Sequence, residues 1–379
     1  MAEAGSDVIF LAGRLVARDD LRGLRDLAGR LRGLGHRSRV LCLAAAPDHA
    51  LPELVECPAL GRRWLLSWAV KALELVEEGG RPRVLHVLGQ GMAEAAIEVA
   101  ERWRIPYLLA VDEFPRGHCR LRLSRKWCKG LVATDAELAE ALTRDLGVPH
   151  RLIRLIPRGI GETGRPEVPP AAIPRAPRVP VVGAAGPLVP GSGFPTFLAA
   201  AKKVIEAGID AEFLIAGHGE DEADLRRRAD RLRIADRLTF ADDLAVGLTF
   251  WDVLDVYCQT SVVPTVGRSL ALAMAHGVPS IASDVEGLRA RVVEGLTGLL
   301  VPRGDASALA LAMIALLSDR EAARRIGDSG REASLGGHDP EAEARRLSEI
   351  YGKVAEASAS GLEGRSGSDE ADVASGRAG

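Results

Sequence analysis

Short apolar runs rich in valine, isoleucine and leucine alternate along the chain with longer segments whose apolar residues recur with helical period. This alternation is typical of repeated βα units around a parallel sheet. In the first half it predicts strands at residues 7–13, 38–44, 83–89, 107–112, 130–134 and 152–157, separated by helical segments such as 21–34 and 91–103. Thr134 and Glu137 have the spacing of a capping box, which predicts that a helix starts there.

The composition changes after Ile160, because residues 161–178 are rich in proline. Proline is excluded from helix interiors and donates no ladder hydrogen bond, so this segment predicts an interdomain linker. A second alternating series predicts strands at residues 179–184, 211–216, 238–241, 256–259, 280–283 and 299–302. The predicted fold class is therefore α/β, with two Rossmann-like parallel-sheet domains, 1–160 and 179–335, and a ligand in the cleft between them.

Two segments follow the second predicted domain. Residues 340–357 have helical period and come after a Gly-Gly-His-Asp-Pro break, so we expect an added helix there. Residues 358–379 are polar, small and nearly devoid of large apolar side chains, so we expect a disordered tail.

Length, charge and cysteine content narrow the class of protein. A chain of 379 residues exceeds what one hydrophobic core usually organises, which supports two domains. A formal net charge of -3 gives no reason to expect nucleic acid. No apolar run reaches membrane-spanning length and the first residues lack a secretion-signal pattern, so we expect a cytoplasmic protein. The five cysteines contain no CxxC pair, which favours reduced thiols.

Four glycine-containing segments occur in order in the second half, at residues 181–194 (VVGAAGPLVPGSGF), 213–220 (FLIAGHGE), 261–288 and 294–319. This series resembles the retaining glycosyltransferases of family 4, also described as glycosyl transferases group 1, which have the GT-B fold. The first half is similar to the family more loosely, at residues 33–43, 85–106 and 152–160. The resemblance implies an acceptor-binding first domain, a nucleotide-sugar-binding second domain and a C-terminal helix that crosses back onto the first domain.

The donor-site signature of this family is degenerate in the chain. The family generally supplies an Arg and a Lys in the first loop of the donor domain, where this chain has Pro187 and Ser192. A family pair of Glu residues, for sugar and ribose hydroxyls, is replaced by Pro264 and Leu272, and Arg291 occupies a further usual Glu position. Because a charged hydrogen bond contributes about 1.5 to 3 kcal/mol, two losses weaken stabilisation of a leaving diphosphate by roughly 3 to 6 kcal/mol.

Other residues of the second domain could still hold a donor. Gly267, Arg268 and Ser269 are predicted to open a helix, and the free amides at a helix start attract phosphate. We hypothesise that Arg268 replaces the missing Arg and Lys, the alternative being a solvated loop residue. His218 could donate to a phosphate or could be an ordinary surface turn histidine. The candidate donor-binding residues are Gly186, Ser192, Gly193, Gly217, His218, Gly219, Gly267, Arg268 and Ser269.

Two acidic residues of the first domain have two interpretations. Asp112 and Glu113 follow a predicted strand, and Asp112 stands where the family usually has a His. They could bind acceptor hydroxyls or serve as a base, which makes Asp112 a candidate catalytic residue. They could equally be ordinary acidic loop residues.

Two aromatic residues and an arginine run also have more than one interpretation. Trp64 and Trp68 lie beside two arginines, which is typical of an interfacial helix on an anionic membrane. Glutamates follow closely, however, so we expect a helix packed by its Trp and Leu face instead. Arg226, Arg227 and Arg228 are surrounded by Asp and Glu and are expected on an exposed helix.

Two hypotheses for function remain. In the first, the protein transfers a sugar from a nucleotide-diphosphate sugar to a glycan, lipid or small-molecule acceptor, with no metal and no further cofactor. In the second, it is a catalytically inactive pseudo-glycosyltransferase that acts as a binding or scaffolding partner. The architecture favours the first hypothesis, whereas the replaced donor-site residues favour the second.

Overall fold

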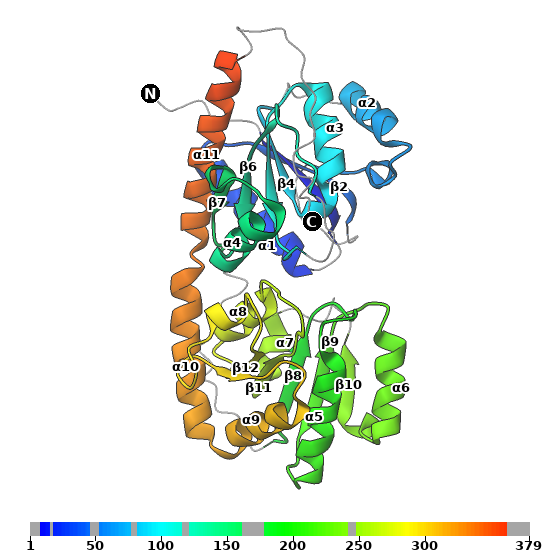
Figure 1. Cartoon of the computed structure of the whole chain (residues 1–379), viewed down its shortest axis with the longest axis vertical. Helices are drawn as coiled ribbons and strands as arrows, with labels where there is room; N and C mark the ends of the chain where they lie inside the picture. The colour runs from blue at the N-terminus through cyan, green and yellow to red at the C-terminus, as the bar shows by residue number, and fades with distance from the viewer. Residues whose placement is uncertain are drawn as a thin grey trace, which may run out of the picture. The chain divides into compact units, whose positions relative to one another are not determined.

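The computed structural model of the chain describes residues 8–15, 18–45, 53–76, 82–115, 121–160, 178–241 and 248–361. The predicted linker therefore lies outside the described residues except for Arg178. The chain divides into two compact units: unit 1 consists of Met1–Gly159 with Pro340–Gly379, and unit 2 consists of Ile160–Asp339. Each unit is built on its own parallel sheet (Figure 1).

The sheet of unit 1 contains seven parallel strands in the order β3-β2-β1-β4-β5-β6-β7. The strands are β1 (Val8–Leu15), β2 (Ser38–Ala45), β3 (Leu54–Glu56), β4 (Val84–Leu88), β5 (Tyr107–Val111), β6 (Cys128–Ala133) and β7 (Ile153–Leu155). The six strands predicted for this half are confirmed. The sequence pattern missed β3, because its apolar run is only Leu54 and Val55 and none of its residues is fully buried.

The helices of unit 1 confirm the predicted βα alternation and correct one helix start. They are α1 (Arg18–Gly33), α2 (Leu66–Val76), α3 (Ala93–Trp103) and α4 (Ala136–Leu146). The N-cap of α4 is Asp135, whose carboxylate accepts from the amides of Glu137 and Leu138 at 2.9 and 3.4 Å. The prediction that Thr134 caps this helix is wrong, since the Thr134 hydroxyl is buried without a hydrogen-bond partner. Asp135 has the extended backbone that an N-cap needs.

Helix α2 also corrects the expectation for the tryptophans. Its buried side is formed by Leu66, Ala69 and Val70, whereas Trp64 is 78% exposed and Trp68 is 65% exposed. The prediction of packing by a Trp and Leu face is therefore wrong. Trp64 lies in the turn before α2 and Trp68 lies on its exposed side, whereas Ala69 and Val70 lie on the buried side, where α2 packs against α3.

The C-terminal helix α11 (Pro340–Gly361) belongs to unit 1, which confirms the predicted return to the first domain. It buries Ala344, Leu347, Tyr351 and Val354 in the same apolar cluster as residues of β1 and α1. These positions recur at helical spacing, so one stripe of α11 completes this core. The helix ends at Gly361 rather than at residue 357, and the predicted tail beyond it lies outside the described residues.

Buried polar contacts fix α11 against unit 1. His86 on β4 contacts the Tyr351 hydroxyl through Nδ1 at 2.5 Å, and His36 contacts the Ser348 hydroxyl through Nε2 at 2.7 Å. Burial lowers the pKa of His86 to about 4, so its imidazole is neutral near pH 7. The helix is therefore held by specific hydrogen bonds as well as by apolar packing.

Unit 2 is built on six parallel strands in the order β10-β9-β8-β11-β12-β13. They are β8 (Val181–Ala185), β9 (Glu212–Ala216), β10 (Leu238–Ala241), β11 (Val256–Gln259), β12 (Ser280–Ser283) and β13 (Leu299–Val301). All six predicted strands of this half are confirmed. The central strands β8 and β11 are largely buried, as a parallel sheet covered on both faces requires.

Helices cover both faces of the unit 2 sheet. They are α5 (Phe194–Glu206), α6 (Glu222–Leu232), α7 (Leu248–Val253), α8 (Arg268–Ala275), α9 (Ala306–Ser318) and α10 (Arg320–Gly337). Cys258 packs in a cluster with α5 and α9, whereas its neighbour Tyr257 packs in a second cluster with α7 and α8. Successive strand residues point to opposite faces, so each face has its own apolar layer.

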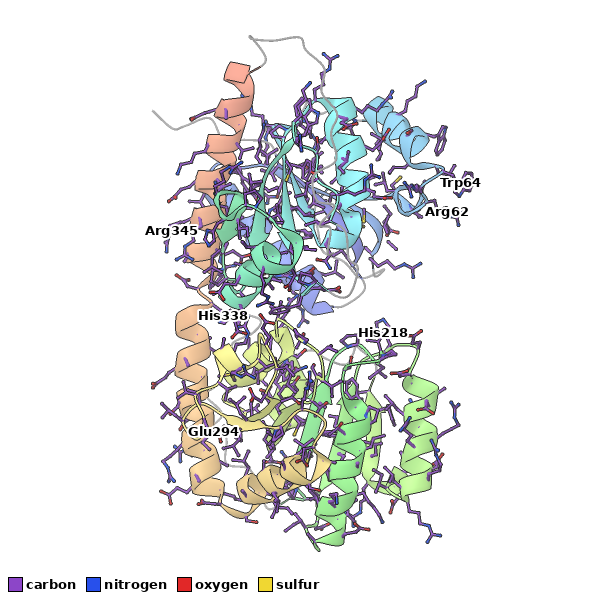
Figure 2. All side chains as sticks on the ribbon, viewed as in Figure 1. Arg62, Trp64, His218, Glu294, His338 and Arg345 are labelled. Atoms are coloured by element: carbon purple, nitrogen blue, oxygen red, sulfur yellow. The ribbon has the colours of Figure 1, made fainter. Side chains whose placement is uncertain are left out.

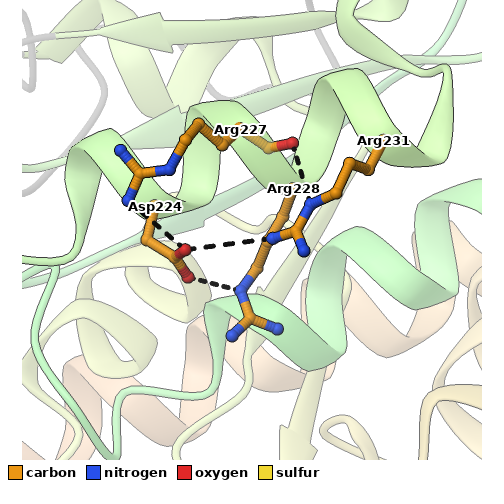
Figure 3. Close-up of polar contacts among 4 residues, drawn as sticks. All are labelled: Asp224, Arg227, Arg228 and Arg231. Atoms are coloured by element: carbon orange, nitrogen blue, oxygen red, sulfur yellow. Dashed lines mark hydrogen bonds and ion pairs between the residues drawn. The ribbon is translucent and has the colours of Figure 1, made fainter.

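The arginine run lies on the exposed surface of α6, as the sequence predicts. Arg227, Arg228 and Arg231 surround the carboxylate of Asp224 at 3.5, 2.5 and 3.9 Å (Figure 3). Such exposed pairs contribute little to stability. None of the helices in the described ranges is long and apolar enough to cross a membrane.

Candidate functional site

The strand order of unit 2 reverses between β8 and β11, so the turns after these strands leave the same edge of the sheet in opposite directions. Two hydrogen bonds join these turns. The amide of Val262 donates to the Gly191 carbonyl at 2.9 Å, and the Thr260 hydroxyl donates to the Ser192 carbonyl at 3.2 Å. The predicted donor-site segments 186–193 and 261–269 therefore meet at this edge.

Gly193 is the point of closest approach between the two turns. Its φ is +80°, and a Cβ placed on it would overlap the carbonyl oxygen of Thr260. It precedes α5 and provides no side-chain cap. Only glycine combines this backbone conformation with this contact, so the residue is required by the packing of the turns.

The turn after β9 joins the same assembly. The amide of Leu188 donates to the His218 carbonyl at 2.9 Å, and the amide of Asp221 donates to the Leu188 carbonyl at 2.9 Å. A Cβ on Gly219 would collide with the Leu188 backbone. The His218 side chain is exposed at this turn (Figure 2). Turns from three strands thus form one continuous backbone surface.

Ser192 and Gly186 both contribute to the turn that follows β8. The Ser192 hydroxyl donates to the Pro187 carbonyl at 2.7 Å, so its proton closes the turn. The amide of Gly186 donates to the Ala216 carbonyl at 3.0 Å. Ser192 therefore stands where the family has a cation, but its hydroxyl can offer a ligand only lone pairs while this bond lasts.

A chain of polar contacts lies beneath these turns. The buried Tyr257 hydroxyl donates to Gln259 Oε1 at 2.7 Å, and Gln259 Nε2 donates to the Ser261 hydroxyl at 3.1 Å. Burial raises the pKa of Tyr257, while its hydrogen bond with Ser269 acts in the opposite direction. The sequence pattern did not single out Tyr257 and Gln259, although their alternation on β11 places them on one face.

Helix α8 begins as the sequence predicts, with Gly267 at its N-cap. Gly267 has φ of +67°, and a Cβ on it would press against the Leu288 side chain. Arg268 is the first helical residue and is partly exposed. The first amides of an α-helix have no intrahelical acceptor, so the start of α8 favours an anion.

A second arginine supports the turn that precedes α8. Arg291 donates through Nε to the Val266 carbonyl at 2.7 Å, and its Nη1 contacts His338 Nε2 at 2.7 Å. His338 Nδ1 lies 2.8 Å from the Ser334 carbonyl, which can only accept. His338 is therefore protonated on Nδ1 and accepts from Arg291 through Nε2. This pairing places a cation where the family usually has Glu.

The candidate acidic residues belong to unit 1. Asp112 and Glu113 are exposed immediately after β5, and both Asp112 carboxylate oxygens lie 3.6 Å from a Cβ built on Gly89. Gln90 Nε2 donates weakly to Glu113 at 3.5 Å. Among the described residues, no group of three His, Cys, Asp or Glu side chains could hold a metal ion.

Two family models match the two halves of the chain. "Glycosyltransferase Family 4" matches residues 22–162, and "Glycosyl transferases group 1" matches residues 179–319. The chain is 34% identical over 167 residues to a phosphatidyl-myo-inositol mannosyltransferase of Mycobacterium leprae, and this match spans 44% of either chain. It therefore spans less than half the length of that relative. A 2-deoxystreptamine glucosyltransferase of Streptomyces kanamyceticus is 26% identical over 336 residues, which cover 80% of each chain.

Solved glycosyltransferase structures share the fold over nearly the whole chain. The Anabaena protein HepE in complex with UDP-glucose superimposes with a TM-score of 0.74 at 17% identity, covering 92% of this chain and 100% of that one. A sucrose-phosphate synthase from Thermosynechococcus elongatus superimposes with a TM-score of 0.73 at 20% identity, covering 93% of this chain and 100% of that one. The matched halves and the two Rossmann-like sheets lead to one conclusion: the chain belongs to the family 4-like glycosyltransferases of GT-B fold.

Proposed function

We propose that the protein transfers a sugar from a nucleotide-diphosphate sugar to an acceptor, with the donor held in unit 2. The observation that carries this proposal is the joining of three strand-end turns into one backbone surface around Gly193. Glycines at close approaches let backbone amides reach a ligand. Ligands of open parallel sheets bind beyond the carboxyl ends of the strands, at the point where the strand order reverses.

Sugar transfer makes the nucleoside diphosphate a leaving group, and its growing negative charge needs cations or aimed amides. The start of α8 supplies amides, and Arg268 supplies a guanidinium at the first helical position. A guanidinium matches phosphate geometry because it can donate two parallel hydrogen bonds. Arg268 and these amides thus take the role that an Arg and a Lys have in the family.

Arg291 fits the same proposal as a positioning residue. Its bonds to the Val266 carbonyl and to His338 fix the turn from which α8 starts. A fixed turn aims the helix amides without reorganisation when charge develops on the donor. The charge of Arg291 also favours an anion near this turn more than the usual Glu would.

The names of similar proteins suggest which substrates to test first. HepE is described in complex with UDP-glucose, and the similar transferases are named for phosphatidyl-myo-inositol and 2-deoxystreptamine. We therefore propose a nucleoside diphosphate sugar as donor and a lipid, glycan or small polyol as acceptor. Asp112, after β5 of unit 1, is proposed as an acceptor-side base or hydroxyl ligand. A cytoplasmic location stays a prediction, as does the lack of a metal or further cofactor.

An inactive binding partner is the second candidate. It is favoured by four replacements, Pro187, Ser192, Pro264 and Leu272, and by the engagement of the Ser192 hydroxyl within its own turn. An inactive relative would neither bind nor hydrolyse nucleotide sugars. Donor hydrolysis without an acceptor therefore separates the two candidates.

The role of Arg268 is tested by calorimetric titration of UDP and other nucleoside diphosphates into wild type and the Arg268→Ala variant. We expect a 10- to 150-fold loss of affinity, the equivalent of about 1.5 to 3 kcal/mol for a charged hydrogen bond. Arg231→Ala is the matched control, because Arg231 is an exposed arginine on α6. Unchanged affinity in Arg268→Ala would remove Arg268 from the donor site.

A further inference from the structure

Two of the five tryptophans of the chain are exposed, and both lie at the start of α2 in unit 1. Trp64 is 78% exposed and Trp68 is 65% exposed, whereas Trp103, Trp127 and Trp251 are at most 8% exposed. Figure 2 shows the Trp64 side chain beside Arg62 at the outer side of the segment before α2. Adjacent exposed indoles form an apolar surface that a monomer surface rarely keeps without use.

The exposed indoles lie close together in the sequence, at one end of α2. The amide of Ala69 donates to the Leu65 carbonyl at 2.8 Å, so helical hydrogen bonding starts at Leu65, just after Trp64. Trp68 and Lys71 are both exposed and are spaced i and i+3 on α2, so they share one side of the helix. The opposite side of the helix packs into unit 1. We call Trp64, Trp68, Lys71, Arg62 and Arg63 the indole face.

The described charges that border the indole face have both signs, with more basic than acidic groups; one of the carboxylates, Glu98, accepts from the Ser67 hydroxyl at 2.7 Å. Arg62 and Arg63 precede Trp64, and the Arg63 side chain is 77% exposed. Among the described ion pairs, the carboxylate at this edge is that of Glu94, which lies 3.8 Å from Arg63 and 3.7 Å from Arg122. A carboxylate shared by two guanidiniums leaves a basic excess, and exposed pairs at these distances are weak.

We propose that the indole face docks on an anionic phospholipid surface. Indole rings have an apolar body and a polar N–H, so they bury favourably at the level of lipid headgroups. Exposed arginine and lysine side chains attract anionic headgroups and can adapt to a fluid surface because their stems are flexible. The contact is peripheral, and it does not depend on the donor site proposed in unit 2.

Vesicle co-sedimentation tests the proposal with full-length protein. We expect binding to phosphatidylcholine vesicles that contain phosphatidylglycerol, weak binding to pure phosphatidylcholine, and loss of binding at high salt. The intrinsic tryptophan emission should shift to the blue on binding, because the two exposed indoles leave water. Trp64→Ser/Trp68→Ser should weaken partitioning by roughly tenfold or more and abolish the shift.

The basic residues need a charge-matched control. Arg62→Gln/Arg63→Gln should weaken partitioning about 25-fold at low salt, since each charge contributes about fivefold. Arg227→Gln/Arg228→Gln changes the net charge equally on the exposed helix α6 and should leave partitioning unchanged. All substituted side chains are exposed, so thermal unfolding of the variants should match wild type.

Several results would overturn the proposal. They are equal binding to both vesicle types, no emission shift, equal losses in the two arginine variants, or a dimer that Trp64→Ser/Trp68→Ser converts to monomer. The last result would assign the face to a protein contact. Nucleoside diphosphate affinity, measured on the same variants, should not change, so failure here is distinguishable from failure of the proposed transferase activity.

Discussion

Replacing Gly193 by alanine tests how closely the turns after β8 and β11 must pack. Gly193 has φ of +80°, and a Cβ there would overlap the carbonyl oxygen of Thr260. An L-residue in the left-handed region costs about 1 to 2 kcal/mol. The turns must also move apart to relieve the overlap, which costs roughly another 1 to 3 kcal/mol. This movement separates the Thr260 hydroxyl from the Ser192 carbonyl, which costs about 1 kcal/mol.

Gly193→Ala should therefore lower the free energy of unfolding of unit 2 by about 3 to 6 kcal/mol. Gly208→Ala is the matched control, because Gly208 has φ of +81° but nothing lies within 4 Å of a Cβ placed on it. Gly208→Ala should lower the free energy of unfolding only by the conformational cost of the left-handed backbone, about 1 to 2 kcal/mol. The difference between the two variants measures the contact between the turns.

Urea unfolding, followed by hydrogen exchange of unit 2 peptides, gives both free energies without assuming that the two units unfold together. Gly193→Ala should also abolish nucleoside diphosphate binding, whereas Gly208→Ala should retain it. Equal losses of stability in the two variants would refute the inferred packing. Normal nucleotide affinity in Gly193→Ala would show that the donor does not need this turn.

Three further predictions concern His86, Arg291 and Asp112. The pKa of His86 in the folded protein is about 4, below its ordinary value of 6.5. Its contribution to the free energy of unfolding is therefore complete above pH 6.5 and is lost as the pH falls toward 4. Urea unfolding of unit 1 should show a loss of up to about 3 kcal/mol over this window, and His86→Asn should flatten it. Arg291→Ala should weaken nucleoside diphosphate binding about tenfold by calorimetry, because the turn before α8 loses its hydrogen bond at Val266 and, through Arg291, its link to His338. Unchanged affinity would exclude a positioning role. Asp112→Asn should lower sugar transfer by at least about tenfold while donor affinity stays normal, and equal transfer rates would assign Asp112 to the ordinary loop residues.

Most strands of both sheets could be predicted from the local sequence, because parallel strands are buried on both faces. Apolar runs such as Val181–Ala185 and Tyr107–Val111 are therefore continuous and easily recognised. The start of α8 could also be predicted locally, because Gly267 directly precedes the amphipathic segment that forms the helix. The edge strand Leu54–Glu56 escaped detection, since its apolar run is only Leu54 and Val55.

The contacts of the candidate site depend on residues distant in sequence. Arg291 and His338 are separated by 47 positions, and Gly193 meets Thr260 across two different strands. No periodic pattern encodes such a pair, because it depends on where two turns end in space. The exposure of Trp68 was misjudged for a related reason: the pattern of α2 contains apolar residues on both faces, and only the packed structure selects the buried one.

The most direct test of the proposed transferase is a calorimetric titration of nucleoside diphosphates and their sugars, with donor hydrolysis measured in the same samples. A rearranged but functional donor site predicts saturable binding of at least one nucleotide sugar together with slow release of its sugar to water. Absence of both binding and hydrolysis across the panel would contradict that claim and favour the inactive partner.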